Sequence, residues 1–136
     1  MSVWTDGSCH GNGRDGARAG AGIWWAANSP RNVSARVPGA QTNMRGELLA
    51  VYIALREADP RRTLILYTDN EVVIRTYCYW VEGMLARGWK CANADIIRPT
   101  AGLLHARPAR VWFRWVKGHS GDVGNDGSDT KANEGA

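Results

Sequence analysis

The stretch RTLILYTDN, residues 62–70, constrains the fold more than any other part of this chain of 136 residues. Its centre is an unbroken apolar run, which ends at Asp69 and Asn70. An uninterrupted apolar strand is typical of the centre of a sheet that helices cover on both faces. Because segments with helical spacing lie before and after this run, it predicts an α/β protein with helices on both faces of a sheet.

Three segments ahead of this run are predicted to form antiparallel strands. They are SVWTDGS, which we expect to break at Gly7, RAGAGIWWA at residues 18–26, and NVSARVPG, which ends at Pro38. Alternation, β-branched residues and tryptophans favour strands in these segments, and glycine-rich turns separate them.

Between the third strand and the central run, the apolar residues recur at helical spacing. The predicted helix extends from Thr42, a capping residue, to Ala58, and Asp59 and Pro60 end it. Another helix is expected from Glu71 to about Trp80, followed by a broken stretch at residues 82–95.

The last third of the chain completes the pattern. We expect a helix from about Ile96 to Ala106, a fifth strand in RVWFRWVK at residues 110–117, and a terminal helix from about Asn125. The elements in sequence order therefore predict a mixed sheet with helices on its faces, in one domain that covers residues 1–136.

Charge and composition narrow the function. The net charge is +4, the isoelectric point is about 9.3, and 14 of the 17 basic residues are arginine, a side chain that suits a phosphate-bearing partner. No run approaches the length of a membrane span, and the N-terminus lacks a secretory signal, so we expect an intracellular protein in the cytoplasm or nucleus. The three cysteines follow no zinc-ligand spacing and are expected to be reduced thiols.

Four acidic residues lie where the local pattern makes them unusual. Asp6 interrupts the first strand, Asp69 ends the central run, Glu47 lies near the apolar side of the first helix, and Asp129 lies in the terminal helix. Each acid alone is more often a turn or solvated residue, but together they are placed to share one pocket. Clustered carboxylates need cations, and oxygen ligands favour Mg²⁺ or Mn²⁺. A pair of such ions can support phosphodiester cleavage.

These motifs, TDGS with Asp6, TNMRGELLA with Glu47, LYTDN with Asp69 and WVKGHSGDVGN with His119 before Asp129, resemble type 1 ribonuclease H in order and spacing. The resemblance spans nearly the whole chain. It implies the RNase H-like fold, with a five-stranded mixed sheet in the order 3-2-1-4-5. It also implies hydrolysis of the RNA strand of an RNA–DNA hybrid by two Mg²⁺ ions, with Mn²⁺ as a substitute, leaving 3′-hydroxyl and 5′-phosphate ends. The four acids match the family's metal ligands, and His119 matches its flexible-loop histidine.

The resemblance also implies a set of residues that contact the hybrid. The candidates for the minor groove are Ser8, Cys9, Asn12 and Asn43. Trp80 matches the residue that packs on the DNA sugar, and Thr42 and Asn93 match a phosphate pocket. The basic protrusion of the family corresponds to Arg87, Trp89 and Lys90, and a core position is an equal alternative for Trp89.

The terminal segment GNDGSDTKANEGA departs from the family pattern. Gly127 and Ser128 stand where the family has helix formers, and Lys131 stands where a leucine would pack, so we expect a frayed helix and insecure metal binding at Asp129. Gly46 is also expected to weaken its helix. The alternatives that remain open are the RNase H domain of a reverse transcriptase or retroelement, and a module that binds the hybrid without cleaving it. We expect a monomer, either a minimal enzyme or a domain of a larger protein.

Overall fold

Five strands form one mixed sheet in the computed structural model, which describes residues 1–136. The strands are β1 (Ser2–His10), β2 (Arg18–Trp24), β3 (Val33–Arg36), β4 (Leu64–Thr68) and β5 (Val111–Trp115). Their order in the sheet is β3-β2-β1-β4-β5, with β1 antiparallel to β2 and parallel to β4. This confirms the predicted fold class and strand order.

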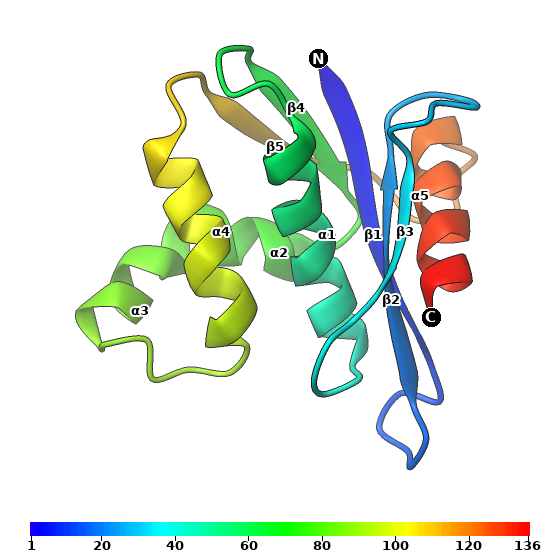
Figure 1. Ribbon diagram of the computed structural model, residues 1–136, viewed down its shortest axis with the longest axis horizontal. Helices are drawn as coiled ribbons and strands as arrows, with labels where there is room; N and C mark the ends of the chain where they lie inside the picture. Colours follow the sequence, from blue (N-terminus) through cyan, green and yellow to red (C-terminus); the bar gives the residue numbers. More distant parts are fainter.

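Helices lie on both sides of the sheet (Figure 1). The helical segments are α1 (Asn43–Glu57), α2 (Glu71–Arg75), the π-helical turn η1 (Thr76–Trp80), α3 (Val81–Ala86), α4 (Ala94–Ala106) and α5 (Val123–Gly135). In Figure 1, α1 and α4 lie on one side of the sheet and α5 lies on the other. None of these helices is both long enough and apolar enough to span a membrane.

The first helix begins as predicted, because the Thr42 hydroxyl accepts a hydrogen bond from the Arg45 backbone N–H at 3.2 Å. The segment after β4 differs from the expected single helix to Trp80. There α2 ends at Arg75, a π-helical turn follows, and α3 continues the chain to Ala86. The extra residue in a π-helical turn shifts the side chains that follow it around the helix axis.

The prediction that Gly7 breaks the first strand is wrong, because β1 continues through it to His10. A Cβ atom at Gly7 would lie 2.3 Å from the Glu47 backbone nitrogen, and one at Gly46 would lie 2.4 Å from the Gly20 carbonyl oxygen. These glycines therefore let α1 lie directly on β1 and β2. The close approach explains why Gly46 is present despite its cost to the helix.

The expectation of a frayed terminal helix is also wrong, since α5 is continuous and the Asp122 side chain caps it by accepting from the Asn125 N–H at 2.8 Å. Added Cβ atoms at Gly124 and Gly127 would lie 2.2 and 2.4 Å from the rings of Trp4 and Trp24. The small residues that make α5 a poor isolated helix thus allow it to pack closely on the sheet. Packing stabilises a helix that intrinsic propensity does not.

The apolar strand β4 lies next to the edge strand β5 rather than at the centre of the sheet, and it is covered less completely than its sequence predicted. Leu64, Leu66 and Thr68 are fully buried on the side of α1, but Ile65 and Tyr67 on the other side are only half-buried. The reason is the position of α5, which packs over β1, β2 and β3.

Candidate active site

Three of the four predicted acids come together on neighbouring elements, and one of them, Asp6, lies in the middle of its strand. Asp6 comes from β1, Glu47 from α1 and Asp69 from the residue after β4, and one carboxylate oxygen of each lies within 4.8 Å of the others. Because β1 and β4 are parallel neighbours, Asp6 and Asp69 lie side by side. The contact of Gly7 with the backbone of α1 then brings Glu47 beneath them.

Burial makes this group electrostatically costly without a cation. Asp6 and Glu47 are each only 4% exposed. Burial raises the pKa of Asp6 to about 7, with a further contribution from the negative charge of Asp69. Burial, and then the charge of Asp6, raise the pKa of Glu47 well above its ordinary value. The Gly7 backbone N–H donates to Asp6 Oδ1 at 2.9 Å, and a side-chain hydrogen bond with Glu47 also favours the charged form of Asp6.

The donor set fits a hard divalent cation. The three side chains offer only oxygen atoms, and Glu47 Oε2 is buried without any hydrogen-bond partner. An orphaned carboxylate oxygen beside two further carboxylates is satisfied by a cation better than by water, and ions such as Mg²⁺ and Mn²⁺ prefer oxygen ligands. These residues could therefore hold a metal ion.

Around the three acids lies an open pocket of about 700 Å³. Asp129 and His119 line it, so all five predicted catalytic residues share one pocket. Asp129 is half-buried on α5 and is not part of the compact group of three, and the Asn133 side-chain amide donates to it at 3.4 Å. His119 is exposed, and its φ of 56° places it in the left-handed region, in a loop between two glycines.

Two residues that the sequence analysis missed hold Asp69 in place. The Trp115 indole Nε1–H donates to the Asp69 backbone oxygen at 3.1 Å, and the Asn125 amide donates to Asp69 Oδ2 at 3.5 Å. Asn125 is only 3% exposed, which is unusual for an asparagine at the start of a helix. The sequence signal for Asn125 was its position after Gly124, in the terminal motif that also contains His119 and Asp129. Arg75 of α2 also lines the pocket and was not predicted.

The predicted substrate residues separate into two groups. Ser8, Cys9 and Asn43 line the pocket with the acids, and the Asn12 side chain, just outside it, accepts a hydrogen bond from the Asn43 N–H at 3.1 Å. The others lie away from the pocket, and they are Thr42, Trp80, Arg87, Trp89, Lys90 and Asn93.

Thr42 and Asn93 are connected by Arg45, which the sequence analysis did not single out. The Arg45 guanidinium is buried, donates to Asn93 Oδ1 at 3.3 Å, and forms a two-pronged ion pair with Asp95 at 2.8 and 2.9 Å. Its backbone N–H is the one that Thr42 caps. The arginine therefore fixes Thr42 and Asn93 close to each other, across a sequence separation of about fifty residues.

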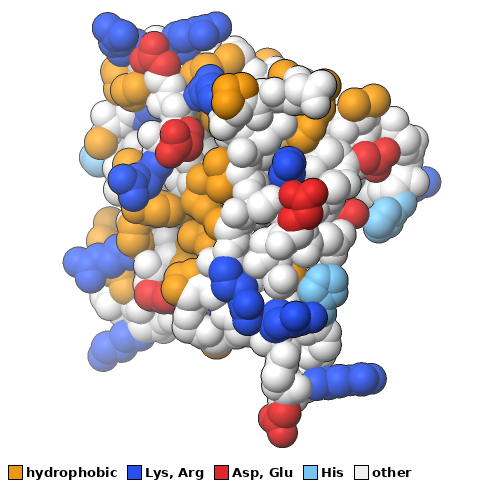
Figure 2. Space-filling view, turned by 45° about the vertical axis from the view of Figure 1, so that its right-hand side comes forward, with side chains coloured by type: hydrophobic (Ala, Val, Ile, Leu, Met, Phe, Trp, Pro, Cys, Tyr) orange, Lys and Arg blue, Asp and Glu red, His pale blue; other side chains and the backbone are white.

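Trp80, at the end of η1, is exposed, as are Arg87 and Lys90 in the segment that follows. Trp89 is half-buried and packs against the hydrophobic core. Figure 2, in which the side of α5 comes forward, shows lysine and arginine side chains at several edges of the molecule with acidic ones among them. Basic side chains are thus scattered on this face. The net charge therefore does not show where a nucleic acid would bind, and that surface has to be inferred from individual residues.

A sheet in the order 3-2-1-4-5 with three clustered carboxylates on β1, on α1 and after β4 defines an α/β protein whose acidic residues could hold a metal ion. The chain belongs to the RNase H family, whose model, described as RNase H, matches residues 1–136.

Named relatives agree with this assignment. The chain is 39% identical to ribonuclease H1 of Mus musculus and of Homo sapiens over 140 residues, which covers 98% of this chain and 49% of each relative. It is 34% identical over 142 residues to ribonuclease H of Polaromonas naphthalenivorans, covering 98% of this chain and 84% of that protein. The chain thus spans about half the length of its mammalian relatives.

Solved structures show the same fold. LC9-RNase H1, described as a type 1 RNase H with the type 2 active-site motif, matches with a TM-score of 0.73 and 28% identity, over 99% of this chain and 71% of that one. The PFV RNase H domain, at 21% identity, matches with a TM-score of 0.72 over 98% of this chain and 92% of that one, and shows the likeness of fold alone.

Proposed function

We propose that this chain is an endonuclease that hydrolyses the RNA strand of RNA–DNA hybrids, leaving 3′-hydroxyl and 5′-phosphate ends, with Mg²⁺ as its metal and Mn²⁺ as a substitute. The observation that carries the proposal is the buried group of Asp6, Glu47 and Asp69, with the orphaned Glu47 oxygen, in a chain of the RNase H family.

The acids have separate roles in this proposal. Asp6, Glu47 and Asp69 hold the first ion, and Asp129, from the wall of the same pocket, completes the site of a second. When bound, a pair of ions supplies an activated water and stabilises the leaving oxygen of the phosphodiester. Trp115 and Asn125 keep Asp69 oriented through its backbone and side-chain oxygens.

His119 acts on protons at the open side of the pocket. Histidine exchanges a proton more readily near neutral pH than other side chains, which suits protonation of the leaving RNA oxygen and release of the product. His119 has a left-handed backbone and lies between Gly118, which packs against the Asp69 carboxylate, and Gly121, which has open space around it.

The hybrid is recognised by shape and backbone. Ser8, Cys9 and Asn43 at the pocket, with Asn12 bonded to Asn43, provide small polar groups for the shallow minor groove and its 2′-hydroxyls. Thr42 and Asn93, positioned by Arg45, form a phosphate site, and Trp80, Arg87 and Lys90 contact the DNA strand. Trp89 supports this segment from the core. Because these groups address sugar and phosphate, cleavage is independent of sequence.

A hybrid-binding module that does not cleave is the second candidate. It is favoured by one observation, the position of Asp129 outside the compact group of three acids. In that case the pocket would hold a single ion, which would not stabilise both the attacking and the leaving oxygen as a pair of ions does.

One experiment separates these candidates. An end-labelled RNA–DNA hybrid, a single-stranded RNA and an RNA duplex are incubated with the protein in Mg²⁺ or EDTA, with Asp69→Asn in parallel. Cleavage of the hybrid alone, in Mg²⁺ alone, and its loss in the variant are expected. Binding of the hybrid without cleavage would establish the module instead, and cleavage that persists in Asp69→Asn would point to a contaminating nuclease.

A further inference from the structure

Part of the sheet surface is left uncovered by α5. Ile65 on β4 pairs with Trp112 on β5, and Tyr67 pairs with Arg114, so these four side chains project from the same side of the sheet. Ile65 and Tyr67 are half-buried, and Trp112 is 44% exposed. An aromatic surface therefore lies open on the outer two strands, beside the part of the sheet on which α5 packs.

Two arginines accompany the exposed tryptophan. The guanidinium carbons of Arg110 and Arg114 lie 5.8 and 5.7 Å from the centre of the Trp112 ring, which is within the range of cation–π attraction. Neither guanidinium takes part in any of the four ion pairs of the molecule, and neither side chain donates a hydrogen bond within the protein. Two positive charges thus flank an aromatic ring without an acidic partner.

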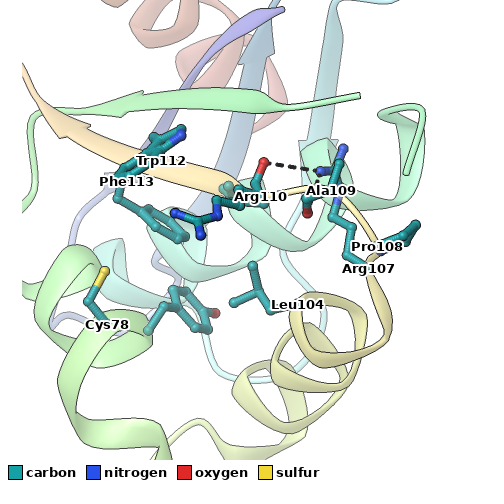
Figure 3. A pocket seen from close by; sticks show the side chains of 10 residues that line it. Cys78, Leu104, Arg107, Pro108, Ala109, Arg110, Trp112 and Phe113 are labelled. Carbon is teal, nitrogen blue, oxygen red and sulfur yellow. Dashed lines mark hydrogen bonds between the residues drawn. The ribbon is translucent and has the colours of Figure 1, made fainter. Parts of the chain in front are cut away.

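The residue that follows Trp112 on β5 faces the opposite side of the sheet. Trp112 and Phe113 project from opposite sides of β5 (Figure 3), and the Phe113 ring stacks on Tyr77 of η1. The pocket of about 480 Å³ between η1, α4 and β5 lies in this region, and Cys78 and Leu104 line it together with Arg110 and Trp112 at its edge. Val111 and Phe113 therefore account for the packing of β5 on the hydrophobic core, and Trp112 is not a member of that core.

The chemistry of this group indicates its ligand. Base rings stack on aromatic side chains and on guanidinium planes, and phosphates pair with arginine, so alternating arginine and tryptophan suits a nucleic-acid strand. A duplex hides the faces of its bases, whereas a single strand presents them. Tyr67 lies one strand and two residues from Trp112, about 8 Å away by sheet geometry. One face of its ring stacks on Trp4, so its outer edge is the part that can contact a neighbouring base.

We propose that Arg110, Trp112 and Arg114 form a binding surface for single-stranded nucleic acid. Tyr67 precedes Asp69 by only two residues, so this surface begins close to the catalytic pocket and can hold a single-stranded segment that continues from a bound duplex. The surface does not require the carboxylate group, and its existence is independent of the function proposed above.

The test is fluorescence anisotropy with labelled twelve-nucleotide oligouridine and oligothymidine at low salt in EDTA, so that cleavage plays no part. Trp112→Ala is expected to raise the Kd by about 5- to 150-fold, the range for loss of one stacked base. Trp112→Phe should restore most of the affinity. Tyr79→Ala, at an exposed aromatic residue on η1, is the matched control and should bind as the wild type does.

Salt dependence tests the arginines. Replacing Arg110 and Arg114 together by glutamine should reduce the slope of log K against log salt by about 1.4, because each contact with a single strand contributes about 0.7. Arg98→Gln, at an exposed position on α4, provides the charge control for a single change. Unaltered affinity in Trp112→Ala, or an unaltered slope in the double variant, would overturn the proposal.

Two further outcomes also overturn it. One is failure of the wild-type protein to bind either oligonucleotide. The other is self-association of the wild type in sedimentation that Trp112→Ala abolishes, while the same variant still binds the oligonucleotides. That result would make this surface an interface between two copies of the chain. Loss of hybrid cleavage does not affect the reading of these binding experiments, so failure of the two proposals can be told apart.

Discussion

Replacing Asp6 by asparagine should make the metal-free protein more stable while it abolishes cleavage. Burial raises the pKa of Asp6 from 3.8 to about 7, so the folded state holds a proton that the unfolded state releases between these values. Stability of the wild type therefore falls as pH rises from about 4 to about 7. Asparagine keeps the oxygen that accepts from the Gly7 N–H and removes the charge.

The size of the expected gain in stability follows from the pKa shift of Asp6. One pKa unit corresponds to about 1.4 kcal/mol, so a shift of about three units gives an upper value of about 4 kcal/mol at pH 8. Because Asp6 and Glu47 titrate together, the gain in the free energy of unfolding is smaller than this upper value, and we expect about 2–4 kcal/mol. For a domain of this length, that is an increase in Tm of about 7–14 °C.

The assay is thermal unfolding followed by circular dichroism in EDTA, at pH 4.5, 6 and 8. The gain of Asp6→Asn over the wild type should be small at pH 4.5 and largest at pH 8. Asp15→Asn, at an exposed residue in the β1–β2 turn, is the control and should change Tm little at any pH. A variant that is less stable than the wild type at pH 8, or a gain that does not depend on pH, would refute the reasoning.

Three other predictions follow from the packing and the site. Gly124→Ala should destabilise the protein by about 1–3 kcal/mol in urea unfolding, because the added methyl group meets the tryptophan ring beneath α5, whereas Gly102→Ala on open α4 should stabilise it by up to about 1 kcal/mol. Equal gains in stability for the two variants would contradict the close packing of Gly124 on the tryptophan ring. Arg45→Met should lower the free energy of unfolding by about 1–3 kcal/mol in the same assay, because the ion pair with Asp95 is lost. The loss is limited because Asp95 is exposed, and water solvates its carboxylate once the arginine is gone. No loss would show that the pair contributes little. His119→Ala should lower multiple-turnover cleavage by about 100-fold while hybrid binding changes little, and an unchanged rate would remove the histidine from the reaction.

The sequence predicted the strand order and the pocket because local patterns and family motifs carry them. Asp69 follows a strand-end signal, and Asp6 and Glu47 lie in family motifs. The parallel arrangement of β1 and β4, with the contact of α1 on β1, then fixes their proximity. The compactness of the group, and the place of Asp129 outside it, required coordinates.

What could not be predicted depends on contacts between distant elements. Gly7 and Gly127 are poor residues for a strand and a helix by propensity, but each lies where another element passes too closely for a Cβ atom. Burial of Asn125 and the role of Arg45 likewise arise from partners far away in sequence. Ile65 and Tyr67 remain half-exposed because α5 packs on other strands, which the apolar run itself does not reveal.

The most direct test of the central claim is the metal dependence of cleavage at a single altered phosphate. In one RNA–DNA hybrid, sulfur replaces a non-bridging oxygen at one scissile position, and the rate of cleavage there is measured in Mg²⁺ and in Mn²⁺ for each stereoisomer. Sulfur is a softer ligand that Mn²⁺ accepts better than Mg²⁺ does. The account predicts slow cleavage in Mg²⁺ and recovery in Mn²⁺ for at least one stereoisomer. If sulfur has the same effect in both metals for both stereoisomers, the carboxylate pocket does not place a metal ion on the phosphate that is cut.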